Sequence, residues 1–351
     1  MISHGNNILI FGNNLGMMLF KDVILTLKKN NNVTLVNRPS KYSTDIKSSG
    51  YSLFRILKKC INKNYERHWI EQIKKQISKS TFDYFIVFGY YQVNNSIVNL
   101  VKNNSPHCRC IIYFYDSFCR LNFSNDIALF DRCFTFDRED AKKYSIDYLP
   151  FFVDRDSCIN KYKYDLCHIG AWSPGHLYRV PILMYLAKIA DDNNLTHFFY
   201  CTYQDIDTFN WVRKIKFYFN VLINKEYRLY LKYYRQFKGC SILHNNHLPY
   251  EQVSSIESQS KCIVEINATR AGLSPRVINA LANGQKIIIN SQSIKKELFY
   301  NSNNIFVIDS NNKDNIDFSF LDMPVSTFDY TDLAIENWIQ ILLDLKTNKY
   351  N

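Results

Sequence analysis

The sequence is poor in residues that break regular structure, with only 10 Gly and 8 Pro in 351 residues. This scarcity excludes collagen-like chains and flexible glycine- or proline-rich chains. No run of 18 apolar residues occurs, and the chain opens directly on a globular pattern. Neither a membrane-spanning helix nor a secretory signal is therefore expected. These absences predict a cytoplasmic protein, with peripheral contact to the inner face of a membrane as a further option.

Paired cysteines of the zinc-binding kind are also missing. The 10 cysteines are scattered along the chain, and no two of them have Cys-x-x-Cys spacing. Several lie in apolar runs, as Cys262 does in residues 261–266, where a reduced cysteine acts as a small hydrophobic residue. We expect reduced structural thiols in a reducing compartment.

The chain does contain enough apolar material for two cores. Hydrophobic residues make up 46% of it, with 25 Phe and 25 Tyr, which excludes a disordered protein. Its length suits two domains of ordinary size. We predict one Rossmann-like domain at residues 1–155, a second at 156–330 and a helix at 331–351 that packs back on the first domain.

The order of the patterns predicts parallel sheets. An apolar run at residues 7–12 leads through Gly12 and Gly16 into a helical pattern at 17–29 and another apolar run at 32–37. This strand–helix–strand order is typical of a doubly wound domain, and it restarts at residues 165–171. The fold class is therefore α/β, with two Rossmann-like domains and a cleft between them. Ligands of such sheets bind beyond the carboxyl ends of the strands, so candidate residues are sought in the turns there.

The strongest candidate turn precedes a predicted helix at residues 276–284. A strand at 261–267 delivers the chain to Arg270, Gly272 and Ser274, and Pro275 opens the helix. Free backbone N–H groups at a helix N-terminus bind anions such as a diphosphate. Arg276 lies in the first turn, where a cation is unfavourable for the helix dipole, so we expect it to face a ligand's negative charge. A purely structural loop–helix junction is the alternative.

Two further turns carry polar residues. Gly170 ends the strand at 165–171, and Arg179 follows early in the next helix, an arrangement that suits a phosphate. His168 in the same strand is either a satisfied structural group or a base. In the first domain, Asp116 follows the run at 110–115, where a carboxylate could accept a proton from an acceptor hydroxyl. Helix capping by Asp116 or Ser117 is the competing interpretation.

The charge is strongly positive, because 43 Lys and Arg residues outnumber 32 Asp and Glu residues to give +11. The excess gathers at residues 47–79 and again at 213–238, where it alternates with Tyr and Phe. Solvated helix faces explain such tracts, and so does contact with an anionic membrane surface or nucleic acid.

Residues 248–309 resemble the nucleotide-sugar half of GT-B glycosyltransferases, and more closely the CgeB-like and lipopolysaccharide or capsule glycosyltransferases of bacteria. Residues 130–154 and the Asp-Ser-Phe triplet at 116–118 resemble the same group, so the resemblance covers most of the chain. It implies two facing Rossmann-like domains, with the donor in the second and the acceptor in the first. It implies no required metal and no other cofactor.

Carried over by position, the resemblance puts Gly272, Arg276 and Asn279 along the diphosphate and ribose of the donor. It puts Gly170 and Arg179 beside the sugar phosphate. Retaining members of the GT-B group carry two glutamates where this chain has Ala271 and Asn279. Asn279 can hydrogen-bond a ribose hydroxyl but supplies no charge.

The sequence thus predicts a metal-independent glycosyltransferase that moves a sugar from a nucleotide-sugar donor to lipopolysaccharide, capsule or a related glycan or lipid-linked acceptor. Helix N-termini, Arg276 and Arg179 would stabilise the leaving diphosphate, and Asp116 would be the base if the reaction inverts the anomeric centre. One alternative is a catalytically inactive GT-B-like protein that binds nucleotide sugars or glycans. Another is a nucleic-acid-binding protein, but no recognisable module supports it, and nucleic acid is not among the expected partners.

Overall fold

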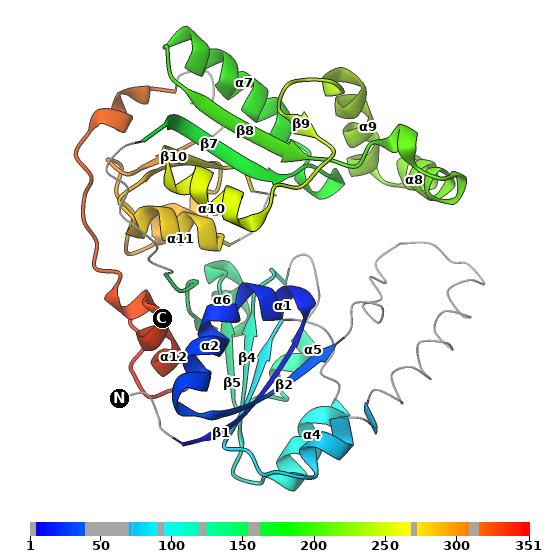
Figure 1. Cartoon of the computed structure of the whole chain (residues 1–351), viewed down its shortest axis with the longest axis vertical. Coiled ribbons are helices and arrows are strands. Elements are labelled where there is room, and N and C mark those ends of the chain that lie inside the picture. Colours follow the sequence, from blue (N-terminus) through cyan, green and yellow to red (C-terminus); the bar gives the residue numbers. More distant parts are fainter. Residues whose placement is uncertain are drawn as a thin grey trace. The chain divides into compact units, whose positions relative to one another are not determined.

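The computed structural model describes residues 5–38, 70–71, 73–89, 95–118, 124–153, 162–267, 272–308 and 316–351. The chain divides into two compact units (Figure 1): unit 1 comprises Met1–Phe152 and Thr331–Asn351, and unit 2 comprises Val153–Tyr330. Each unit has a six-stranded sheet whose paired strands are all parallel. The predicted α/β class with two Rossmann-like sheets is confirmed. Arg270 and most of the basic tract at 47–79 lie outside the described residues.

The sheet of unit 1 has the strand order β2-β1-β3-β4-β5-β6. Its strands are β1 (Asn7–Asn13), β2 (Asn32–Arg38), β3 (Tyr84–Phe88), β4 (Arg109–Phe114), β5 (Arg132–Thr135) and β6 (Asp147–Tyr148). Its helices are α1 (Asn14–Leu19), α2 (Lys21–Asn30), α4 (Asn95–Asn104), α5 (Ser124–Ile127), α6 (Arg138–Tyr144) and α12 (Ile335–Leu342). The central strands are buried over most of their length, as strands covered on both faces should be.

The helix expected at residues 17–29 forms earlier and in two pieces, α1 and α2, separated at Phe20. The Phe20 side chain is fully buried and stacks on Phe88 with ring centroids 4.2 Å apart. Gly16 in α1 lies so close to β3 that an added Cβ would be 2.8 Å from the carbonyl oxygen of Phe88. The glycine turn therefore serves close packing of the first helix on the sheet.

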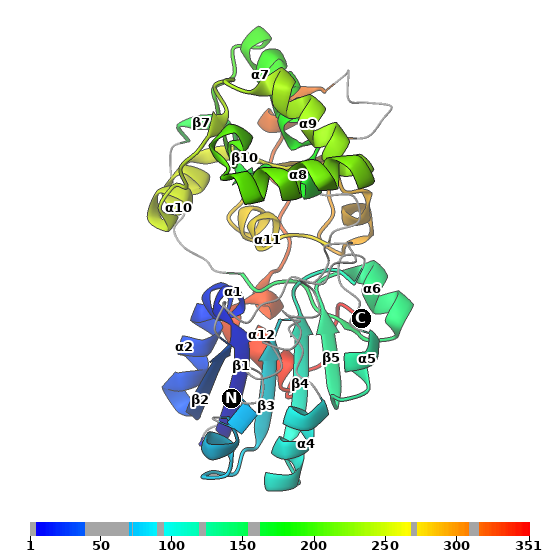
Figure 2. The same ribbon diagram turned by 90° about the vertical axis from the view of Figure 1, so that its right-hand side faces the viewer.

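The C-terminal segment packs on unit 1 through α12, which contacts α2 (Figure 2). Trp338 of α12 is fully buried, and its ring centroid lies 5.1 Å from that of Tyr113. The Trp338 indole N–H donates to the carbonyl oxygen of Pro150 at 2.8 Å. This hydrogen bond satisfies the polar end of an otherwise apolar ring.

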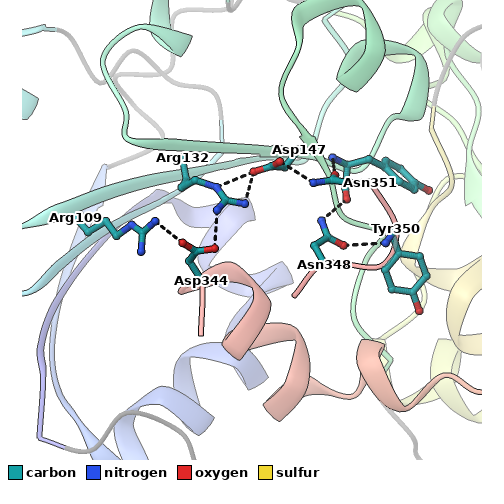
Figure 3. A network of polar contacts seen from close by, with 8 residues as sticks. Arg109, Arg132, Asp147, Asp344, Asn348, Tyr350 and Asn351 are labelled. Atoms are coloured by element: carbon teal, nitrogen blue, oxygen red, sulfur yellow. Dashed lines mark hydrogen bonds and ion pairs between the residues drawn. The ribbon is translucent and has the colours of Figure 1, made fainter. Parts of the chain in front are cut away.

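Ion pairs hold the end of the chain against the strands of the same unit (Figure 3). Asp344 accepts from Arg109 at 2.5 Å and from Arg132 at 2.6 Å, and Arg132 also pairs with Asp147. Asn351 continues the chain of contacts, because its amide donates to Asp147 at 2.7 Å. Three short strands of unit 1 are thus joined to a segment about 200 residues away in sequence.

Unit 2 has the strand order β12-β11-β10-β7-β8-β9. Its strands are β7 (Tyr164–Ala171), β8 (His197–Thr202), β9 (Leu243–His244), β10 (Ser260–Glu265), β11 (Lys286–Ile289) and β12 (Ile305–Val307). Its helices are α7 (Arg179–Asp192), α8 (Trp211–Ile223), α9 (Lys225–Phe237), α10 (Tyr250–Ser258) and α11 (Pro275–Ala282). Numbered within the unit, this is the order 3-2-1-4-5-6 of nucleotide-binding Rossmann sheets, whose direction of winding reverses between β7 and β10.

The basic segment at residues 213–238 forms two helices that protrude from the sheet of unit 2 (Figure 1). Asn224 separates them, and its side chain accepts from Glu226 N at 2.8 Å as the N-cap of α9. Among the helices of the described residues, none combines the length and the apolar character needed to cross a bilayer.

Candidate functional site

The point where the winding of the unit 2 sheet reverses, between β7 and β10, is bridged by Arg179. Its side chain is buried, and its Nε and Nη2 atoms donate to the carbonyl oxygen of Ile266 at 3.1 and 2.9 Å. Its Nη1 donates to the carbonyl oxygen of Ala171. Ala171 is the last residue of β7 and Ile266 directly follows β10, so one guanidinium joins the ends of the two central strands. Burial lowers the pKa of Arg179, and the charge of Glu265 opposes that effect.

His168 lies beside this bridge and is completely buried. Its Nδ1 is 2.7 Å from the carbonyl oxygen of Val264, so Nδ1 carries the proton and donates across from β7 to β10. Burial, followed by the charges of Arg179 and Arg276, holds the pKa of His168 well below its usual value. The ring is therefore neutral and Nε2 carries a lone pair. This Nε2 has no hydrogen-bond partner among the described residues.

Gly170 lies close against these two side chains. A Cβ at this position would lie 3.0 Å from His168 Nε2 and 3.0 Å from Arg179 Nη1. A side chain here would therefore press on both polar groups. Gly170 and Arg179, which the sequence analysis selected as neighbours, are therefore in contact.

The N-terminus of α11 follows the end of β10 closely in sequence. Pro275 is the first helical residue and Ser274 is the N-cap, as the sequence predicts, but the Ser274 side chain makes no capping hydrogen bond. The buried Ser274 Oγ and Asn267 Nδ2 atoms both lack hydrogen-bond partners in the described part of the chain. Gly272, two residues before Ser274, is also buried. Buried polar atoms normally find partners, so these three orphaned atoms, with His168 Nε2 as the third, indicate a place for a polar ligand.

A cavity of about 230 Å³ opens beside Arg179. It is lined by the turn after β7, the start of α7, the start of α9 and the end of β10, through residues that include His176, Arg179, Lys225, Ile266 and Asn267. The lysine and the arginine make its charged lining predominantly basic, against a single carboxylate, Glu226. This composition suits an anionic ligand.

The expectation for Arg276 needs correction. Its Nε is 2.6 Å from Glu257 Oε1 and its Nη1 is 3.1 Å from Glu265 Oε2. Burial lowers the pKa of Arg276, but the charges of the two carboxylates outweigh burial, so the pKa is raised above its usual value. The pKa of Glu257 is also raised, by burial and by Glu265 against the opposing effect of Arg276. The protein's own carboxylates thus explain a cation in this first helical turn, and a ligand charge is not required.

The predicted donor residues fall into two groups. Arg276 and Asn279 line a smaller cavity of about 110 Å³ together with residues of α10, whereas Arg179 lines the larger one. Gly170 belongs with the second group through its contact with Arg179. The structure therefore does not bring all the predicted donor residues to one cavity.

Asp116 lies in unit 1, just after β4. Its Oδ1 accepts a hydrogen bond from Ser117 N at 3.0 Å. No helix begins directly after Asp116 or Ser117, so the capping interpretation is wrong for both. Ser117 Oγ instead donates to Asp140 at 2.9 Å, and Asp137 caps α6.

Sequence reasoning missed Asn267 and left His168 undecided. Asn267 is a polar residue directly after the apolar strand β10, at the position where Rossmann sheets bind ligands, and that signal was available. The orphaned Nε2 of His168 was not available from sequence, because it depends on the partner that Nδ1 finds across the sheet.

No protein-family model and no curated protein sequence matches the chain. Solved structures do match it along nearly its whole length. A lipopolysaccharide outer-core galactosyltransferase in its apo form has 11% identity and a TM-score of 0.55, covering 97% of this chain and all of the other. A UDP-forming α,α-trehalose-phosphate synthase from Burkholderia vietnamiensis has 10% identity and a TM-score of 0.55, with 96% of each chain covered.

A UDP-GlcNAc 2-epimerase from Neisseria meningitidis, solved with UDP-GlcNAc bound, has 12% identity and a TM-score of 0.50, covering 97% of this chain and 98% of the other. At such identities the likeness shows the fold alone. The chain has the two-sheet GT-B fold of glycosyltransferases, which is also found in epimerases. None of these comparisons confirms the closer resemblance to the CgeB-like group.

Proposed function

We propose that the chain is a glycosyltransferase that binds a nucleotide-sugar donor in unit 2, where the winding of the sheet reverses. The observation that carries this proposal is the set of orphaned polar atoms there, His168 Nε2, Asn267 Nδ2 and Ser274 Oγ. Sheets of this order bind nucleotides at this place. The fold likeness to a UDP-forming synthase and to an epimerase with bound UDP-GlcNAc supports a nucleotide-sugar ligand.

The orphaned atoms divide into donors and an acceptor. Asn267 Nδ2 donates, so it suits a phosphate oxygen. His168 Nε2 accepts, so it suits a sugar or ribose hydroxyl, and Ser274 can do either. A nucleotide sugar presents both kinds of group within one molecule. Sulfate, which has no hydrogen to donate, would leave the histidine unsatisfied.

Arg179 supplies the positive charge that the reaction requires. Its hydrogen-bond acceptors in the described part of the chain are neutral carbonyl oxygens, and Glu265 acts on it only through its charge, whereas Arg276 pairs directly with two carboxylates. As the glycosidic bond to the nucleoside diphosphate breaks, negative charge grows on the leaving phosphate. A fixed cation in a water-poor site stabilises that charge. Arg276 has a positioning part in this proposal, because it ties α11 to Glu257 and Glu265.

The acceptor is proposed to be lipopolysaccharide, capsule or a related glycan or lipid-linked molecule. The fold likeness to a lipopolysaccharide galactosyltransferase and the resemblance of residues 248–309 support this class. In an inverting reaction Asp116 would take the proton from the attacking hydroxyl. One observation favours the alternative of an inactive GT-B-like binding protein. Arg276, which lines a cavity together with Asn279, is already paired with two carboxylates of the protein.

The test begins with nucleotide-sugar binding. Titration calorimetry and thermal shift against a panel of nucleotide sugars should identify one that binds and stabilises the protein by mass action. Asn267→Asp replaces an amide donor with a carboxylate beside the phosphates and should weaken binding at least tenfold. Asn245→Asp, an exposed asparagine of the same unit, makes the same charge change and should not weaken it.

Three outcomes separate the alternatives. Binding with sugar transfer to a membrane-extracted glycan supports the glycosyltransferase. Binding of a nucleotide sugar with no turnover on any such acceptor supports the inactive binding protein. Wild-type affinity in Asn267→Asp, or no binding by any nucleotide sugar, contradicts the proposed site.

A further inference from the structure

The helix α8 displays its apolar side to solvent. Only Phe217 of its 13 residues is buried, whereas Trp211 is 74% exposed, Ile215 62% and Leu222 75%. The exposed apolar residues of α8 form what we call the α8 face: Trp211, Val212, Ile215, Tyr218, Phe219, Leu222 and Ile223. A surface helix of a globular protein ordinarily turns such a stripe toward the core.

The α8 face is continuous. At about 100° per residue its seven members fall within an arc of about 140° on the helix, without a charged residue among them. Phe217 lies on the opposite side and packs against Phe209 and Tyr230 of the same unit. The helix is therefore anchored from behind. A contiguous apolar surface of this kind marks an interaction site.

The charges around the α8 face have one sign. Lys214 and Lys216 lie at the two edges of the arc, and α8 contains no acidic residue. The adjoining helix α9 adds Lys225, Arg228, Lys232 and Arg235 against the single carboxylate of Glu226. The occupant of this surface should therefore combine an apolar layer with negative charge at its border. An anionic lipid bilayer presents both together.

The dimensions and the side chains fit a helix lying in the membrane plane. A helix of 13 residues is about 20 Å long, shorter than the roughly 30 Å hydrocarbon layer, so it cannot span. Trp211 and Tyr218 are residues that favour the border between acyl chains and headgroups. A second copy of the chain fits less well, because a symmetric contact would bring two basic surfaces together.

We propose that α8 lies in the plane of an anionic membrane. The α8 face contacts the border between acyl chains and headgroups, and its flanking lysines contact lipid phosphates. This surface differs from the one proposed for the nucleotide sugar, whose binding is measured without lipid. The two proposals can therefore fail separately.

Vesicle flotation tests the proposal directly. The full chain should float with vesicles of phosphatidylcholine and phosphatidylglycerol and bind at least tenfold more weakly to phosphatidylcholine alone. Leu222→Ser should lower binding to the anionic vesicles about tenfold. Leu298→Ser changes another exposed leucine of unit 2, 56% exposed, and should bind as the wild type does.

Charge and fluorescence give two independent readouts. The double change Lys214→Gln and Lys216→Gln should weaken vesicle binding, whereas Lys188→Gln on α7 should not. Trp211 is highly exposed, so its emission should move to shorter wavelength on anionic vesicles, and Trp211→Phe should remove that shift. Thermal unfolding and nucleotide-sugar affinity in lipid-free buffer should match the wild type in each variant.

Several results would overturn the proposal. Binding that ignores lipid charge, or an equal loss in Leu222→Ser and Leu298→Ser, would show that α8 is not the contact. A lipid-free dimer that Leu222→Ser converts to a monomer would assign the α8 face to a second copy. Salt-sensitive binding of RNA or DNA in place of vesicles would assign it to nucleic acid.

Discussion

Both sheets are parallel and change their direction of winding once, but they differ at the point where the winding reverses. In unit 1, between β1 and β3, the protein fills the place itself: Asn13 Oδ1 accepts from Gly16 N at 2.7 Å and from the Tyr115 hydroxyl at 3.0 Å. The Tyr115 ring also lies against Gly89. In unit 2, between β7 and β10, the buried His168 Nε2 has no partner in the described part of the chain.

This difference shows that a shared architecture does not give two shared sites. Unit 1 uses its glycines to bring a helix and an aromatic ring close to the sheet. In unit 2, Gly170 lets two buried polar side chains lie close to the strand. The same residue type thus serves helix packing in one unit and the approach of polar side chains in the other, and variants of the two glycines should separate these roles.

The largest expected effect separates chemistry in unit 1 from binding in unit 2. Asp116→Asn keeps the shape of the side chain but removes the proposed base, so sugar transfer should fall about 10²–10⁴-fold. Nucleotide-sugar affinity should stay unchanged by calorimetry. Asp126→Asn in the same unit is the control and should retain transfer. Full activity in Asp116→Asn would exclude it as the base.

A matched pair of alanines tests the two glycines. Gly170→Ala places a methyl group 3.0 Å from both His168 Nε2 and Arg179 Nη1, and should weaken nucleotide-sugar binding at least tenfold. Gly16→Ala forces a methyl group against a backbone carbonyl, and should lower the free energy of unfolding by about 1–2 kcal/mol without weakening binding.

Calorimetry and denaturant unfolding on both glycine variants decide the comparison. If Gly16→Ala weakened binding while Gly170→Ala did not, the ligand site would belong to unit 1. If both lost only stability, neither place would be the binding site.

The last prediction concerns the pH dependence of stability alone. Burial, and then the charge of Asp140, raises the pKa of Asp137 from 3.8 to about 6. Between these two values the folded state binds more protons than the unfolded state, so stability falls as pH rises from about 4 to 6. Asp137→Asn keeps the capping oxygen and removes the titration. It should gain up to about 3 kcal/mol relative to the wild type at pH 7; an equal pH dependence in both proteins would contradict this.

Much of the fold could be predicted because apolar periodicity is local. The runs at 7–12, 32–37 and 165–171 became β1, β2 and β7, and Pro275 opened α11 as expected, with Gly284 at positive φ beyond its end. The break at Phe20 was not visible, since it depends on stacking against Phe88 from a distant strand. The orphaned Nε2 of His168 was not visible for the same reason, because Nδ1 finds its partner on another strand.

The sequence by itself determined the parallel sheets, the turns that follow their strands and the basic aromatic segment, because spacing and residue type act over a few neighbours. Only the tertiary structure decided which cations form ion pairs. Arg179 and Arg276 look alike in sequence, yet Arg179 faces carbonyl oxygens and Arg276 faces Glu257 and Glu265. The charge that a site offers depends on which side chains the fold brings within a few ångströms, and the Coulomb energy there depends on burial.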